Sequence, residues 1–239
     1  MQNIIYLIII LLIILFYFNY VNTYEQFDGK IKLADIKIDE NILITIREIL
    51  KKVDEIFGNH DIQYWADCGT LLGMIRHQNI IPWDDDGDIS IMKHDEYKFL
   101  KLKPLFENAG YEISSWWGGY KIYPKNGKHM EEFWQGRIYK YKYPSVDIFI
   151  MDYNQDKSIV HYHNSNLRKL WPKEYYFTKY LFPLKKYKFA DFSLWGPAYP
   201  EEYLNRVYGN DWLTVAYLQY DHKNMKMHKK RKFNLTDVV

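Results

Sequence analysis

The pattern of apolar and polar positions divides the 239 residues into an apolar start, a polar stretch and a long region of regular elements. No charged residue interrupts the apolar run from Ile4 to Phe18, which extends to Val21. At about 1.5 Å per residue, the extended run nearly spans the ~30 Å hydrocarbon core of a bilayer. We therefore expect residues 1–21 to form a transmembrane signal-anchor or a signal peptide, and the missing A-x-A cleavage site favours the anchor.

Beyond a polar stem at residues 22–38, the chain shows helical and strand-like periods. Apolar residues recur at helical spacing from residue 39 to residue 57, which predicts an amphipathic helix that Gly58 ends. Residues 62–68, 86–92 and 145–151 have the apolar content and alternation of buried strands. Weaker patterns predict a helix from Asp95 that Gly110 ends, a strand at 111–123 interrupted by Gly118 and Gly119, a strand at 137–143, and a helix from Pro200 that Gly209 ends.

The composition is that of a globular protein. Hydrophobic residues make up 48% and charged residues 26%, and the net charge of +2 gives no reason to expect a nucleic-acid partner. The aromatic content of 18% leaves two interpretations open, stacking surfaces for sugars or bases and ordinary core filling. The single cysteine, Cys68, excludes a disulfide within the chain and a cysteine-based zinc site. For residues 222–239 we expect a solvated basic tail, with binding of an anionic lipid or polymer as the alternative.

Four carboxylates fall within five positions, at Asp84, Asp85, Asp86 and Asp88. Like charges this close repel one another, so such a cluster indicates a solvated loop or a bound cation, and the apolar flanks indicate a segment that enters a core. Strand alternation places Asp86 and Asp88 on one face and leaves the other two acids at the entrance. If the strand at 145–151 is the neighbour, Asp147 joins them, and the three carboxylates form the oxygen-rich site that Mg²⁺ or Mn²⁺ prefers.

A small-residue turn precedes this acidic cluster. Gly69 lets the backbone approach a phosphate closely, and Thr70 is predicted to cap a short helix whose N-terminal N–H groups favour an anion. Arg76, at the end of that helix, is a candidate for a donor phosphate or for a salt bridge to the acids. Lys121 is a second candidate phosphate contact.

The segment G-T-L-L-G-M-I-R-H-Q-N-I-I-P-W-D-D-D-G-D-I closely resembles the signature of the LicD/fukutin family. S-V-D-I-F resembles that family's later aspartate strand, and P-E-E-Y-L-N-R-V-Y-G-N-D-W resembles its closing helix. The resemblance implies an α+β fold over residues 39–221, a polymerase-β-like nucleotidyltransferase fold with helices on a mixed central sheet. It also implies metal ligands and catalytic groups at Asp86, Asp88 and Asp147, and a phosphate turn at Gly69 and Thr70. Gly87 stands where the family commonly has a branched aliphatic residue, which loosens the strand but keeps both acids on one face.

The resemblance implies a metal-dependent transferase. Such an enzyme moves a phospho-linked alcohol, for example phosphocholine or ribitol phosphate, from a CDP-activated donor to a glycan acceptor. Two alternatives stay open: a nucleotidyltransferase that attaches NMP from an NTP, and a catalytically inactive, membrane-tethered glycan-binding protein. With an uncleaved anchor we expect a single-pass membrane protein whose catalytic domain is luminal or extracytoplasmic, which the sequon at Asn234 also fits.

Overall fold

The computed structural model describes residues 25–26, 30–221, 223–224 and 226–238. The predicted membrane segment at residues 1–21 lies outside the described residues. Within the described part, no helix combines the length and the apolar character that a membrane crossing requires. The chain divides into two compact units, residues 34–213 and a smaller unit that holds the described parts of residues 1–33 and 214–239.

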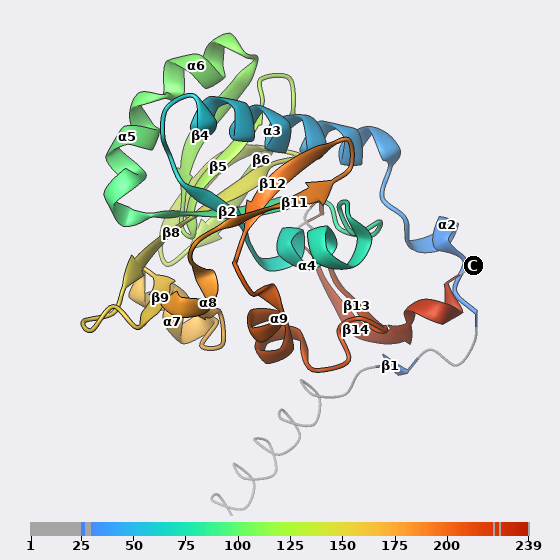
Figure 1. Ribbon diagram of the computed structural model, residues 1–239. Helices are drawn as coiled ribbons and strands as arrows, with labels where there is room; N and C mark the ends of the chain where they lie inside the picture. The colour runs from blue at the N-terminus through green and yellow to red at the C-terminus, as the bar shows by residue number, and fades with distance from the viewer. Residues whose placement is uncertain (1–24, 27–29, 222, 225, 239) are drawn as a thin grey trace, which may run out of the picture. The chain divides into compact units, whose positions relative to one another are not determined.

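The larger unit has a mixed sheet with helices packed on it, which confirms the expected α+β class (Figure 1). Its seven strands follow the order β10-β9-β8-β3-β2, and β5 pairs with both β8 and β4. The strands of this sheet are β2 (Tyr64–Ala66), β3 (Gly87–Met92), β4 (Tyr111–Trp116), β5 (Gly119–Pro124), β8 (Val146–Tyr153), β9 (Ile159–Tyr162) and β10 (Tyr175–Phe177).

Strand β8 is the centre of the sheet. It pairs in parallel with β3, where Asp88 lies opposite Asp147, and antiparallel with β5, where Lys121 lies opposite Asp147. Every residue of β3 is buried, and its polar side chains, Asp88 and Ser90, form hydrogen bonds inside the unit. The two strands predicted most strongly from the sequence are therefore neighbours in the sheet.

Helix α3 (Glu40–Gly58) covers one face of the sheet. It begins after Asp39, whose side chain accepts the N–H of Asn41 at 2.8 Å. A Cβ atom at Gly87 would lie 3.1 Å from Ile46 of this helix and 3.1 Å from Val146 of β8. Glycine at this position thus allows α3 to lie close against the sheet, rather than simply loosening the strand.

The other face of the sheet carries α4 (Cys68–His77), which follows β2 directly. The predicted helix start at Thr70 is wrong. Asp67 is the N-terminal cap and accepts the N–H of Cys68 at 2.8 Å, so the cap lies three residues earlier than predicted. Thr70 instead accepts the backbone N–H of Asp88 at 2.8 Å and ties α4 to β3.

The structure confirms the expected strand at residues 137–143, as one arm of a hairpin, and adds a second hairpin. One joins β6 (Lys128–Trp134) to β7 (Arg137–Tyr143), and the other joins β11 (Lys185–Phe189) to β12 (Phe192–Gly196). The predicted helix after Asp95 is divided into two short helices, which a 3-10 turn precedes. The remaining elements of this unit are α2 (Leu33–Ile36), η1 (Lys93–Asp95), α5 (Glu96–Lys101), α6 (Lys103–Asn108), α7 (Ser165–Leu170), α8 (Thr178–Leu181) and α9 (Pro200–Tyr208). Helix α2 starts one residue before the unit itself, which begins at residue 34.

The smaller unit is a three-stranded sheet in the order β1-β14-β13. Its elements are β1 (Glu25–Gln26), β13 (Val215–Asp221), β14 (Lys226–Asn234) and η2 (Leu235–Asp237). Residues 222–239, for which we expected a basic tail, thus contain a strand that pairs antiparallel with β13 and parallel with β1.

Candidate metal and phosphate site

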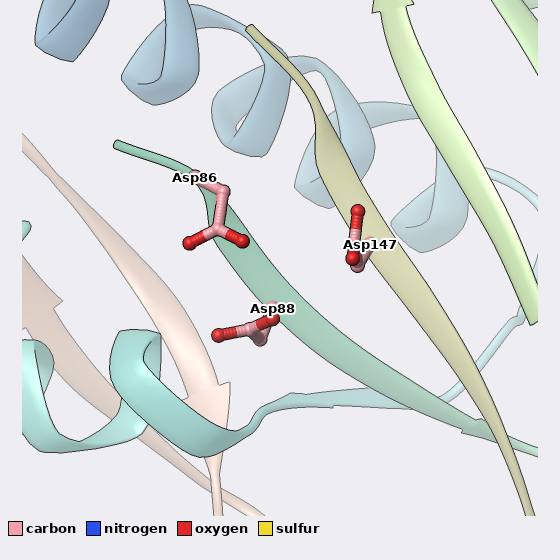
Figure 2. A group of neighbouring side chains, drawn as sticks. All are labelled: Asp86, Asp88 and Asp147. Atoms are coloured by element: carbon pink, nitrogen blue, oxygen red, sulfur yellow. The ribbon is translucent and has the colours of Figure 1, made fainter. Parts of the chain in front are cut away.

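Three carboxylates converge where β3 and β8 lie side by side. Asp86 lies immediately before β3, Asp88 is the second residue of β3 and Asp147 lies in β8, and Figure 2 shows the three side chains on the same side of the two strands. One oxygen atom of each carboxylate lies within 4.8 Å of those of the other two. The three side chains are buried, with 8%, 9% and 3% of their residues' surface exposed. Hard oxygen donors gathered in this way fit Mg²⁺ or Mn²⁺.

The charges at this site are poorly compensated around Asp88. Burial, followed by the nearby carboxylates of Asp86 and Asp147, raises the pKa of Asp88 well above its ordinary range. The backbone N–H of Gly69 donates to a carboxylate oxygen of Asp88 at 3.2 Å, which offsets only part of this cost. A divalent cation would stabilise the ionised form of all three acids.

Lys121, on β5, supplies a positive charge on the side of Asp147 that is opposite to Asp88 on β3. Its ammonium donates to both oxygens of the Asp147 carboxylate, at 2.5 and 2.7 Å. The ammonium also lies 4.1 Å from the ring centroid of Trp116 and 4.8 Å from that of Tyr141, within the range of cation–π attraction. The predicted phosphate contact is thus a buried lysine that belongs to the acid site itself.

The start of α4 is held against the acids by a buried hydrogen-bond network around Asp67. Its carboxylate accepts the N–H of Cys68, the hydroxyl of Tyr176 at 2.5 Å and the hydroxyl of Ser90. Asp67 is only 1% exposed, so its capping role is part of the core. This residue was missed from the sequence, although a carboxylate that ends a strand directly before a small-residue turn is itself a capping pattern.

Asp84 and Asp85 are not equivalent to the three converging acids. Asp84 lies against Gly69, since a Cβ atom at that glycine would be 2.5 Å from a carboxylate oxygen of Asp84. Asp85 is buried, and it accepts the hydroxyl of Tyr143 at 3.0 Å. The pair therefore packs the acidic loop, Asp84 against α4 and Asp85 against the β6–β7 hairpin. No sequence pattern identifies Tyr143 as the partner of Asp85, because the contact joins residues far apart in the chain.

Arg76 lies at the far end of α4 from Gly69. Its guanidinium donates to the carbonyl oxygen of Trp212 at 2.7 Å and to the ring of His77 at 2.9 Å. Burial lowers the pKa of Arg76 to about 10, while the nearby Tyr208 and Asp84 act in the opposite direction. The structure therefore brings Gly69, Thr70 and Lys121 to the three acids. The backbone of Arg76 is about two helical turns from Gly69, but its guanidinium lies near enough to Asp84 to interact with that carboxylate.

The chain is similar in sequence to a described family and to several known proteins. A family model described as LicD/FKTN/FKRP, nucleotidyltransferase domain, matches residues 61–199, a range that contains all three acids. An uncharacterized protein of Rickettsia typhi is 34% identical over 244 residues, which cover 99% of this chain and 71% of the relative. The human ribitol-5-phosphate transferase FKTN is 27% identical over 169 residues, 70% of this chain and 32% of the relative. The lipopolysaccharide cholinephosphotransferase LicD of Haemophilus influenzae is 40% identical over 62 residues, 23% of each chain.

Proposed function

The chain belongs to the LicD/FKTN/FKRP nucleotidyltransferase-domain family, and from this premise we propose that it transfers a phospho-linked alcohol from a CDP-activated donor to a glycan acceptor. The observation that carries the proposal is the convergence of Asp86, Asp88 and Asp147 beside the N-terminus of α4. Relatives named as ribitol-5-phosphate and choline-phosphate transferases support the class of transferred group. We also propose that the sheet and its helices are a polymerase-β-like nucleotidyltransferase fold.

In the proposed reaction, a hydroxyl oxygen of the acceptor bonds to the β-phosphorus of the donor, and the proton of that hydroxyl passes to solvent. The bond from that phosphorus to the oxygen of the CMP leaving group breaks, and CMP is released. A divalent cation held by Asp86, Asp88 and Asp147, with Mg²⁺ or Mn²⁺ as our candidates, would neutralise charge on the donor diphosphate and on the leaving group.

The chain's own residues fix the geometry for this transfer. The absence of a side chain at Gly69 lets the carboxylates of Asp84 and Asp88 lie close to the first turn of α4, where the helix dipole favours negative charge. Lys121 holds the carboxylate of Asp147 through two hydrogen bonds, so that this side chain is oriented before substrate arrives. Asp67 fixes the position of α4 relative to β3 through Ser90 and its own backbone N–H, which donates to the carbonyl of Asp88 at 3.0 Å.

The test is a screen of CDP-choline, CDP-ribitol and CDP-glycerol for CMP release, with Mn²⁺ or with EDTA, in the presence of candidate glycans. We expect metal-dependent CMP release with at least one donor, and its loss in Asp86→Asn but not in Asp61→Asn, which changes an exposed acid. Transfer of labelled NMP from an NTP would instead show nucleotidyl transfer. Glycan binding without metal-dependent nucleotide binding would show an inactive glycan-binding protein, and either result would overturn the proposal.

We further propose that residues 1–21 anchor the protein in a membrane with its catalytic unit on the extracytoplasmic side. The support is the uninterrupted apolar run from Ile4 to Phe18. Alkaline carbonate extraction of cells should leave the full chain in the membrane pellet, and a chain without residues 1–21 should move to the supernatant. Release of the full chain by carbonate would contradict the anchor.

A further inference from the structure

A contiguous cluster of tryptophans lies beside the acid site. The ring centroids of Trp116 and Trp117 are 4.5 Å apart, those of Trp117 and Trp134 are 4.5 Å apart with nearly parallel rings, and those of Trp117 and Trp171 are 5.6 Å apart. All four side chains are only half-buried. They come from β4, the β4–β5 turn, β6 and the segment after α7. We call these four residues, Trp116, Trp117, Trp134 and Trp171, the tryptophan platform.

The platform is continuous with the acids. The ammonium of Lys121, which binds Asp147, lies 4.1 Å from the ring centroid of Trp116. Phe149 lies two residues after Asp147 on the same face of β8, about 7 Å along the strand. Its ring centroid is 6.0 Å from that of Trp116 and 6.2 Å from that of Trp171. The platform therefore begins about one sugar unit away from the carboxylates.

The ring orientations are fixed by the protein itself. Glu132 accepts the indole N–H of Trp116 at 2.7 Å with one oxygen and that of Trp117 at 2.6 Å with the other. The ring of Trp116 folds back over Gly118, where any Cβ atom would overlap it. A surface held in one conformation before binding loses little conformational entropy when a ligand arrives.

The polar groups around the platform distinguish between ligands. A site for a quaternary ammonium group combines aromatic faces with a carboxylate that can face the cation. The carboxylate beside the platform is that of Glu132, and both of its oxygens already accept indole N–H groups. The exposed rim instead carries neutral amides at Gln135, Asn164 and Asn166. The amide of Asn164 donates to the carbonyl oxygen of Trp117 at 3.2 Å, and that of Asn166 to Gln135 at 3.3 Å. Flat apolar faces with amides at their rim suit a neutral sugar, whose C–H face stacks and whose hydroxyls form hydrogen bonds.

We propose that the tryptophan platform binds the acceptor glycan by stacking a sugar ring on its indole faces and presenting the next sugar's hydroxyl to the acid site. The inference rests on the proposed transfer to a glycan. Binding to the platform itself needs neither donor nor metal, so it can be tested independently of the transfer reaction.

The test is binding of the full chain to a glycan microarray in EDTA, followed by titration of the retained free oligosaccharides by tryptophan fluorescence. Trp134→Ala should weaken binding about tenfold, and Trp134→Phe should restore part of it, because a smaller aromatic face remains. Phe133→Ala is the matched control. Phe133 is the neighbouring aromatic residue of β6, is 71% exposed, and lies on the other side of the strand. It should bind within twofold of the wild-type chain.

Three results would overturn the proposal. They are no retained glycan on the array, an equal loss in Phe133→Ala and Trp134→Ala, or retention confined to spots that carry a quaternary ammonium group. Far-UV circular dichroism of each variant shows whether it is folded. If Trp134→Ala is not folded, Trp134→Phe replaces it in the comparison with Phe133→Ala. If the array result is as expected but no CDP-alcohol releases CMP, the platform binds glycan and the transfer proposal alone fails.

Discussion

Replacing Lys121 with methionine should strongly destabilise the protein. Lys121 and Asp147 are 4% and 3% exposed, and their ammonium and carboxylate groups form two hydrogen bonds of 2.5 and 2.7 Å. Removing one partner of such a pair leaves a buried charge uncompensated, which costs about 3–5 kcal/mol. Here the remaining carboxylate also faces Asp86 and Asp88, so we expect the upper part of that range in EDTA at neutral pH. The free energy of unfolding can be measured by urea denaturation followed by circular dichroism.

Two further variants separate this effect from the loss of packing. Lys140→Met removes an ion pair with Glu131 in which the side chains are 74% and 60% exposed, so it should cost no more than about 1 kcal/mol. Adding Asp147→Asn to Lys121→Met removes the unpaired charge and should recover at least about 2 kcal/mol. If Lys121→Met cost no more than Lys140→Met, or if Asp147→Asn gave no recovery, the buried ion pair would not have the role that we assign to it.

Two further predictions concern α4 and the buried Glu174. Gly73→Ala should lower the free energy of unfolding by about 2 kcal/mol, because its methyl group would lie 2.6 Å from the backbone oxygen of Asn79. The methyl group of Gly69→Ala would instead lie 2.5 Å from a side-chain oxygen of Asp84, which can shift more easily than backbone, so this variant should cost less than about 1 kcal/mol. Urea denaturation of both variants checks this order, and equal costs would contradict it. Burial raises the pKa of Glu174 to about 7 from 4.5. Between pH 4.5 and pH 7 the folded state therefore keeps a proton on Glu174 that the unfolded state has lost. The free energy of unfolding should consequently fall by about 2 kcal/mol as the pH rises from 4.5 to 7. Glu174→Gln should remove that part of the pH dependence, and parallel curves for the two proteins would refute the assignment.

The central part of the site could be predicted from the sequence because its determinants are local. Alternation along one short strand places Asp86 and Asp88 on the same face, and an apolar strand with a single acid offers Asp147 as their partner. The adjacency of the two strands was a hypothesis, and the register of Asp88 opposite Asp147 confirms it. The roles of these residues in metal binding and catalysis stay predictions.

The remaining parts depend on contacts that a single sequence does not display. Both Asp67 and Thr70 are suitable caps, and only the hydrogen bond from the backbone of Asp88 to Thr70 shows why the earlier residue is used. Charged residues obscure the alternation of strand β6, so its sequence pattern does not predict a strand. The tryptophan platform joins β4, β6 and the segment after α7, so its composition was visible but its assembly was not.

The most direct test of the account is calorimetric titration of Mn²⁺ into the wild-type chain and into Asp88→Asn, with and without CMP. The acid site predicts one bound cation in the wild-type chain, together with affinity at least about 100-fold weaker in Asp88→Asn, because one of three charged ligands is lost. Asp61→Asn, which changes an exposed acid, should bind as the wild-type chain does. Equal affinities in the wild-type chain and Asp88→Asn, or no binding by the wild-type chain under either condition, would contradict a metal site at Asp86, Asp88 and Asp147.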